Sequence, residues 1–208
     1  MKPRLVIATN NQGKLREFRE LLDGCGFDLV TPADLGVPFD VEETGATFEE
    51  NARLKAVEAA RSCKLIALAD DSGLEVDHLD GRPGIFSARY AGGDRTDSDI
   101  SEARQLELLL GEMSGVPGEQ RTARFRCVIA IATPDGSVQL VDGVFEGRIA
   151  HEARGTNGFG YDPYFLLPGL GRTAAELGPD EKNAISHRGR ALAHLVAQLR
   201  ALAMNDER

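Results

Sequence analysis

Residues 65–76 read Leu-Ile-Ala-Leu-Ala-Asp-Asp-Ser-Gly-Leu-Glu-Val, and this stretch decides how the fold is interpreted. The apolar run at residues 65–69 predicts a buried strand, and residues 74–76 predict a second short one. Between them, Asp70-Asp71-Ser72-Gly73 places two carboxylates at the expected end of a strand, where α/β proteins gather their active sites. Adjacent acids repel each other unless cations or hydrogen-bond donors compensate, so this segment marks a candidate site.

The flanking sequence predicts alternating strands and helices. Strands are expected at residues 5–8, 28–30, 125–132 and 138–145, the last two joined by a turn at residues 134–136. Helices are expected at residues 14–22, 47–63, 98–110 and 189–203, and Thr47 with Glu50 forms a capping box for the second. This alternation predicts an α/β fold, and no repeat or linker divides residues 1–208, which are expected to form a single domain.

The composition excludes several classes of partner. The 208 residues include 33 acidic and 24 basic side chains, a net charge of −9 that disfavours nucleic acid and anionic membranes as partners. No apolar run approaches the roughly 20 residues that a membrane-spanning helix needs. The three cysteines lack paired spacing and predict reduced thiols, so a cytoplasmic location is expected.

The loop Thr9-Asn10-Asn11-Gln12-Gly13-Lys14 joins the first predicted strand to the first predicted helix. Backbone N–H groups at a helix N-terminus bind anions, Gly13 permits close approach, and Lys14 adds a positive charge. The P-loop pattern is absent. An ordinary strand-to-helix turn with a polar cap explains the same residues equally well.

Lys55 shares the apolar stripe of the helix at residues 47–63 with Ala52 and Ala59. A lone lysine at such a position more often extends past the stripe to solvent. In the preceding loop, Glu42 and Glu43 offer the hard oxygen ligands that suit Mg²⁺, which proteins usually hold with one or two carboxylates plus substrate phosphates.

Asp70-Asp71-Ser72-Gly73, taken alone, is more often an Asx turn with surface acids. Its combination with two nearby acids, with Lys55 and with an anion-binding loop instead predicts metal-assisted attack on a polyphosphate.

A glycine-rich segment at residues 155–163 contains Phe159, Tyr161 and Asp162. Aromatic rings in such a loop can stack on a nucleobase while the carboxylate accepts a ring N–H. Farther along, Ser186 is a plausible N-cap that leaves His187 and Arg188 in the first turn of the last helix. Cations are unfavourable at that end of the helix dipole, so these two require an anionic or acceptor-rich partner.

Seven short motifs follow one another along the chain: Thr9-x-Asn11-x-x-Lys14, Glu42-x-x-Gly45, Asp70-Asp71-Ser72-Gly73-Leu74, Pro83-Gly84, Ser87-Ala88-Arg89-Tyr90, Phe159-Gly160-Tyr161-Asp162-Pro163 and Ser186-His187-Arg188. In this order they resemble the inosine triphosphate pyrophosphatase family, whose bacterial members are XTP/dITP diphosphatases. Each motif is weak alone, but their order from Leu5 to about Leu199 is specific. The family often has Gly at the position of Asn10, and Asn also tolerates left-handed backbone angles.

The resemblance implies an elongated mixed β-sheet flanked by helices, with two lobes and a central cleft, in a homodimer. It implies Mg²⁺-assisted hydrolysis of ITP, dITP and XTP to the monophosphate and pyrophosphate, which removes deaminated purines from the nucleotide pool. Asp71 would accept the proton of the attacking water and bind the metal together with Glu42. The residues implied in substrate binding are Thr9, Asn10, Asn11, Gln12, Gly13, Lys14, Lys55, Ser72, Phe159, Gly160, Tyr161, Asp162, Lys182, His187 and Arg188. No role is implied for Asp70.

A non-enzymatic purine nucleotide sensor is the alternative, since it could share the anion-binding loop and the base-binding residues. It would not need Glu42 and Asp71 as metal ligands, so turnover that depends on Mg²⁺ separates the two. The sequence lacks the helix motif of a Nudix hydrolase and the Asp-x-Asp-x-Thr/Val motif of a haloacid-type phosphatase.

Overall fold

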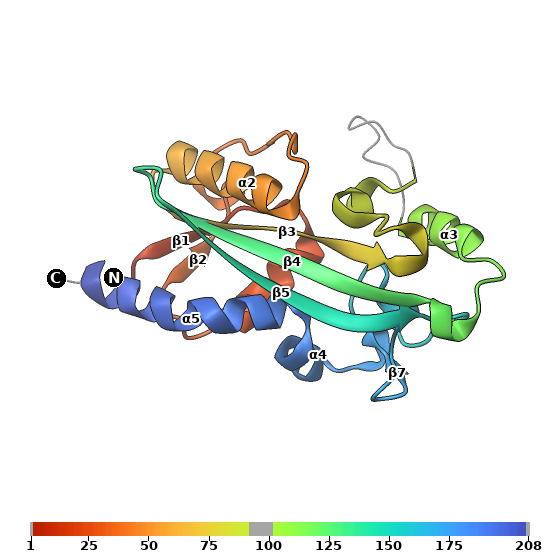
Figure 1. Ribbon diagram of the computed structural model, residues 1–208. Coiled ribbons are helices and arrows are strands. Elements are labelled where there is room, and N and C mark those ends of the chain that lie inside the picture. Colours follow the sequence, from red (N-terminus) through yellow and green to blue (C-terminus); the bar gives the residue numbers. More distant parts are fainter. Residues whose placement is uncertain (1, 92–101, 207–208) are drawn as a thin grey trace. The chain divides into compact units, whose positions relative to one another are not determined.

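The computed structural model describes residues 2–91 and 102–206. Its strands form one seven-stranded sheet in the order β2-β1-β3-β4-β5-β6-β7 (Figure 1). The strands are β1 (Arg4–Ile7), β2 (Asp28–Val30), β3 (Ile66–Val76), β4 (Thr122–Ala132), β5 (Val138–Ile149), β6 (Phe165–Leu167) and β7 (Arg172–Thr173). The α-helices are α1 (Gln12–Leu21), α2 (Phe48–Cys63), α3 (Glu102–Glu112), α4 (Pro179–Ile185) and α5 (His187–Asp206). Short 3₁₀ helices lie at Ala33–Leu35, Asp77–Leu79, Gly84–Arg89, Gly118–Gln120, Asp162–Tyr164 and Ala174–Glu176.

The sheet combines parallel and antiparallel pairs. β1 runs parallel to both of its neighbours, with Leu5 opposite Leu29 of β2 and Ile66 of β3. β6 runs antiparallel to β5 and to β7. The prediction of an α/β fold with a mixed sheet flanked by helices is therefore confirmed.

The chain divides into two compact units, each built from separated segments. Unit 1 comprises Met1–Asp71, Cys127–Gly143 and His187–Arg208, and unit 2 comprises Ser72–Arg126 and Val144–Ser186. The strands β3, β4 and β5 each contribute residues to both units. The single domain expected from the sequence stays a prediction.

In unit 1, helices cover both faces of the strands. Leu15 and Phe18 of α1 share a buried core with Leu192 and Leu195 of α5 and with the strand residue Leu68. Successive strand residues point to opposite faces of the sheet. The buried residues Ala67 and Ala69, on either side of Leu68, therefore face the alanine-rich side of α2. Figure 1 shows α2 and α5 on opposite sides of these strands.

Unit 2 has its own core, in which aromatic side chains join three strands. The ring of Phe165 in β6 lies 4.4 Å from that of Phe125 in β4 and 5.3 Å from that of Phe145 in β5. Leu109 and Met113, in and just after α3, belong to the same buried cluster. Such rings bury a large apolar area, and their tilted arrangement is favourable.

The two short strands predicted at residues 65–69 and 74–76 are one continuous strand, β3. The carboxylates therefore lie in the middle of a strand, and the prediction that they follow its end is wrong. The reason is pairing: Asp70 and Asp71 are only 2% and 4% exposed, and cations compensate both. Gly73 does not make a turn either, because it lies within β3. A Cβ there would lie 2.3 Å from the Gly84 carbonyl oxygen, so this close approach requires glycine.

The other predicted elements are present, with shifted ends. β4 begins at Thr122 and β5 ends at Ile149, so both are longer than predicted, and α5 begins at His187. Residues 98–101 of the predicted third helix lie outside the described residues. The sequence pattern did not predict α4, β6 and β7, because segments of two to seven residues carry too little periodicity.

Two further expectations can be compared with the structure. Within residues 2–91 and 102–206, none of the helices combines the length and apolar character required to cross a membrane. The thiols of the three cysteines are free, and those of Cys25 and Cys127 are buried.

Candidate active site

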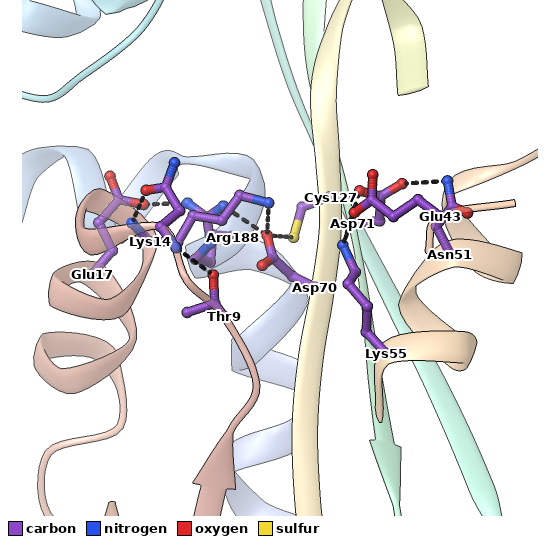
Figure 2. A network of polar contacts seen from close by, with 11 residues as sticks. Thr9, Lys14, Glu17, Glu43, Asn51, Lys55, Asp70, Asp71, Cys127 and Arg188 are labelled. Carbon is purple, nitrogen blue, oxygen red and sulfur yellow. Dashed lines mark hydrogen bonds and ion pairs between the residues drawn. The ribbon is translucent and has the colours of Figure 1, made fainter. Parts of the chain in front are cut away.

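Asp70 and Asp71 lie side by side in β3 but point to opposite faces of the strand (Figure 2). This follows from the two-residue period of a β-strand. Asp70 faces the side that carries Lys14 and Arg188, whereas Asp71 faces α2. Two like charges in adjacent positions thus enter two separate polar clusters, both within unit 1.

Asp71 receives a different partner from α2 at each carboxylate oxygen. The Lys55 ammonium lies 3.2 Å from Oδ1, and the Asn51 amide donates to Oδ2 at 3.2 Å. The two α2 residues are four positions apart and therefore share one face of the helix. The Lys55 side chain is only 12% exposed, so it turns to the acids rather than extending to solvent. The alternative of a solvated lysine is wrong.

Burial raises the pKa of Asp71 above its ordinary value, although the charges of Lys55 and Lys14 oppose this rise. Burial alone would lower the pKa of Lys55, but the nearby carboxylates of Asp71, Glu43 and Asp70 raise it. Lys55 therefore stays charged at neutral pH. A carboxylate whose pKa is raised toward neutrality is a better proton acceptor than an ordinary surface acid.

The loop before α2 approaches this cluster through Glu43. The Lys55 ammonium lies 2.6 Å from Oε1 of Glu43, while Glu42 is exposed. The role predicted for Glu42 as a metal ligand stays a prediction. Glu43, which the sequence offered only together with Glu42 and to which the resemblance gives no role, is the acid of this pair that joins the cluster. The sequence shows only that two acids are adjacent at positions 42 and 43. A local pattern does not show which of the two side chains turns inward.

The residues around Asp71 fit a magnesium ion that substrate oxygens would complete. Among the described residues, no group of three or more His, Cys, Asp or Glu side chains could hold a metal ion alone. The carboxylates of Asp71 and Glu43 nevertheless converge on one ammonium group, so this place already stabilises a positive charge. Mg²⁺ commonly takes one or two carboxylates together with water and phosphate oxygens, which is the donor set offered here.

Asp70 forms the second cluster, in which four charged side chains are paired. Its Oδ2 accepts from Nη2 of Arg188 at 2.8 Å and lies 3.2 Å from Nζ of Lys14. The other end of the Arg188 guanidinium donates to the carboxylate of Glu17 in α1. Burial would raise the pKa of Asp70, but the charges of Lys14 and Arg188 hold it far below its ordinary value.

For Arg188, this pairing confirms the prediction that a cation at the start of the last helix has an anionic partner. Arg188 is 1% exposed and enclosed by Asp70 and Glu17. The sequence did not single out Glu17. The only feature that could have indicated its role is its position next to Phe18, which is buried. Contact of His187 and Arg188 with a nucleobase stays a prediction, and both side chains are buried in unit 1.

The loop between β1 and α1 has the shape of a helix-terminal anion site. Asn11 caps α1 by accepting from the Lys14 N–H at 2.9 Å, and Thr9 Oγ1 accepts from the Asn11 N–H at 3.2 Å. The first turn of α1, which opens with Gln12 and Gly13, contains no acidic residue, so the positive end of the helix dipole is not neutralised locally.

The backbone of Asn10 is not left-handed, so the tolerance of Asn for left-handed angles does not explain why Asn stands where the family often has Gly. In the described part of the chain, the non-glycine residues with positive φ are Lys64 and Asp80. The Asn10 side chain instead donates to the Phe39 carbonyl oxygen at 3.1 Å, which ties this loop to the segment before α2.

In unit 2, the glycine-rich segment brings Phe159, Asp162 and Lys182 together. The Lys182 ammonium lies 2.6 Å from Oδ2 of Asp162 and 5.1 Å from the centre of the Phe159 ring. The same oxygen accepts from the Phe159 backbone N–H at 2.9 Å. A Cβ on Gly158 would lie 2.0 Å from that oxygen, so this turn requires glycine.

The other predicted residues of unit 2 are placed as follows. Tyr161 is buried, and its hydroxyl donates to the Ser87 carbonyl oxygen at 2.8 Å, so Phe159 is the more exposed of the two rings. The Gly160 N–H donates to Glu102 at 3.0 Å. Ser72 follows Asp71 in β3 and is partly buried.

Comparisons with known proteins identify the family of this chain. The profile of the Ham1 family matches residues 5–198. The chain is 50% identical over 196 residues to the dITP/XTP pyrophosphatase of Exiguobacterium sibiricum, covering 94% of this chain and 96% of that protein. It is 48% identical over 196 residues to the dITP/XTP pyrophosphatase of Bacillus subtilis, covering 94% of this chain and 96% of that protein.

Solved structures give the same result. A HAM1 protein from Coxiella burnetii superposes with a TM-score of 0.83 at 45% identity, covering 95% of this chain and 98% of that one. The Staphylococcus aureus Ham1 protein superposes with a TM-score of 0.81 at 43% identity, covering 95% and 98% of the two chains. With a family profile matching nearly its whole length and relatives at about half identity, this chain belongs to the Ham1 family.

Proposed function

We propose that this chain is a nucleoside triphosphate pyrophosphatase that hydrolyses the non-standard purine nucleotides ITP, dITP and XTP to the monophosphate and pyrophosphate. The relatives named dITP/XTP pyrophosphatases support this substrate class. The observation that carries the proposal is the buried Asp71 carboxylate, held between Lys55 and Asn51 beside an acidic loop. This is the environment that a general base for water needs.

In the proposed reaction, Asp71 accepts a proton from water at its carboxylate as the water attacks the α-phosphorus. Lys55 and Lys14 stabilise the negative charge that develops on the departing pyrophosphate, since fixed positive charges aimed at a leaving group lower the barrier. The loop at residues 9–14 binds phosphate oxygens through the start of α1. Mg²⁺, held by Asp71 and Glu42 with Glu43 nearby, would supply charge neutralisation of the phosphates when bound.

The base is proposed to lie against the partly exposed ring of Phe159, with Asp162 and Lys182 as its polar neighbours. Hypoxanthine and xanthine carry a 6-oxo acceptor where adenine carries an amino donor. A hydrogen-bond donor that faces this position would bind the oxo group and oppose the adenine amino group, a discrimination of about 1–3 kcal/mol.

The test uses purified protein with MgCl₂ and, separately, ITP, XTP, GTP and ATP, with pyrophosphate and orthophosphate measured in parallel. Pyrophosphate from ITP and XTP, with little from GTP and ATP, is expected. Orthophosphate as the product would move the attack to the γ-phosphorus and overturn the mechanism. Binding of ITP without release of either product would favour the purine nucleotide sensor.

Asp71→Asn is the matched variant for this assay, because it keeps the size of the side chain and removes the proton acceptor. Turnover of ITP is expected to fall by at least about a hundredfold, the lower range for loss of a general base, while ITP still binds. Wild-type turnover in this variant would remove Asp71 from the mechanism.

A further inference from the structure

Asn51 is a fully buried amide, 0% exposed, near the start of α2. Both ends of its side chain are used. Its Nδ2 donates to Oδ2 of Asp71 at 3.2 Å, and its Oδ1 accepts from the Gly45 backbone N–H at 2.8 Å. Gly45 belongs to the loop that carries Glu42 and Glu43. One side chain therefore joins the acidic loop to the acid in β3, and Figure 2 shows Asn51 beside Asp71.

The close approach of this loop to α2 depends on glycine at position 45. A Cβ on Gly45 would lie 2.6 Å from Oδ1 of Asn51 and 3.0 Å from its backbone nitrogen. Such contacts are too short for any other residue, so the hydrogen bond requires Gly45. The Glu-x-x-Gly spacing then has a physical reason, because the glycine fixes the loop on α2 through Asn51.

The start of α2 is itself held in place, so Asn51 is a rigid attachment point. Thr47 Oγ1 accepts from the Glu50 N–H at 3.2 Å, and the Glu50 carboxylate accepts from the Ala46 N–H at 2.6 Å. Phe48 in the first turn is buried. The cap satisfies backbone donors on both sides of the loop-to-helix junction.

We propose that Asn51 is a positioning residue of the proposed hydrolysis, which orients the Asp71 carboxylate and sets the distance of the Glu42–Glu43 loop from it. Only a side chain with an acceptor at one end and a donor at the other makes both contacts. An aspartate would keep the acceptor for Gly45 but could not donate to Asp71, and an alanine would lose both contacts. Groups that orient a ligand or a base in this way typically change activity or metal affinity by about 10–100-fold when removed.

The experiment compares Asn51→Ala and Asn51→Asp with the wild type and with Ala59→Gly. Ala59 is buried two turns farther along α2 and serves as the control for a weakened helix. We expect kcat on ITP to fall about 10–100-fold in both Asn51 variants, with KM changed less than about threefold. The control is expected to lose thermal stability and keep its kcat. Wild-type kcat in Asn51→Asp, or a loss of kcat in Ala59→Gly as large as in Asn51→Ala, would overturn the proposal.

A second measurement does not depend on turnover. Hydrogen exchange of the Gly45 amide, followed by NMR on the protein without nucleotide, is expected to accelerate in Asn51→Ala and to stay slow in Asn51→Asp. Unchanged exchange in Asn51→Ala would overturn the link between Asn51 and the loop. Because the inference rests on the proposed function, the wild type is assayed first. Absence of pyrophosphate from ITP and XTP would reject the proposed function. The hydrogen exchange of the Gly45 amide tests the contact between Asn51 and the loop independently of turnover.

Discussion

At the scale of single residues, the adjacent carboxylates of β3 respond to their surroundings in opposite directions. Burial raises the pKa of Asp71, and the lysines near it do not fully offset this. Burial acts in the same direction on Asp70, but Lys14 and Arg188 outweigh it and lower the pKa strongly. One step along a strand thus separates a candidate proton acceptor, whose pKa is raised, from a carboxylate whose pKa is lowered.

This difference predicts how Asp70 contributes to stability as the pH changes. Its pKa is lower in the folded protein than the value of about 3.9 expected in the unfolded chain. The contribution is therefore complete well above that value and is lost progressively as the pH falls from it toward the lower pKa of the folded protein, because in this range only the unfolded chain takes up the proton. In urea unfolding between pH 6 and pH 3, Asp70→Asn is expected to reduce the dependence of the free energy of unfolding on pH.

At pH 7 the same variant is expected to lose about 3–5 kcal/mol, because it leaves a buried charge without its partner. An identical pH dependence in wild type and Asp70→Asn would contradict the low pKa of Asp70. Ser62→Ala, a change at an exposed position of α2, is the control for the unfolding measurement.

At the scale of elements, α5 packs closely on β5 at Gly143. A Cβ on Gly143 would lie 2.2 Å from the His187 carbonyl oxygen and 2.7 Å from the Ala191 backbone nitrogen. Both are backbone atoms of α5, which cannot turn aside as a flexible side chain could. The absence of a side chain at Gly143 therefore sets the position of the first turn of α5, from which Arg188 reaches Asp70.

Two glycine-to-alanine substitutions are consequently expected to have opposite signs. Gly143→Ala should destabilise unit 1 by about 1–3 kcal/mol or more, the usual cost of overpacking. Gly111→Ala in α3 should stabilise the protein by about 0.5–1 kcal/mol, because a Cβ there meets nothing within 4 Å and alanine favours helix. Thermal unfolding of both variants checks this, and a stabilising Gly143→Ala would show that α5 can move away from β5.

At the scale of the whole molecule, the resemblance that implies the activity also implies a homodimer. Light scattering coupled to size-exclusion chromatography is expected to give twice the chain mass of 22.4 kDa. A mass that remains at one chain at micromolar concentration would contradict the dimer. The measurement is made with and without ITP, so that a substrate-linked change of mass is seen separately.

Much of this protein follows from local sequence. The short Asp-Leu-Val segment at residues 28–30 and the Thr47 cap identify β2 and the start of α2, since these signals depend on neighbouring residues. The ordered motifs likewise identify the family without any structure, and they predict a set of candidate site residues.

The tertiary structure alone decided how those residues meet. Asp70 and Asp71 remain inside β3 because Arg188, 118 residues away along the chain, and Lys55 compensate their charges. The roles of Glu17 and Asn51 likewise depend on contacts with residues distant in sequence. A local pattern records which side chains are available, whereas charge compensation in a buried site depends on which segments the fold brings within a few ångströms of each other.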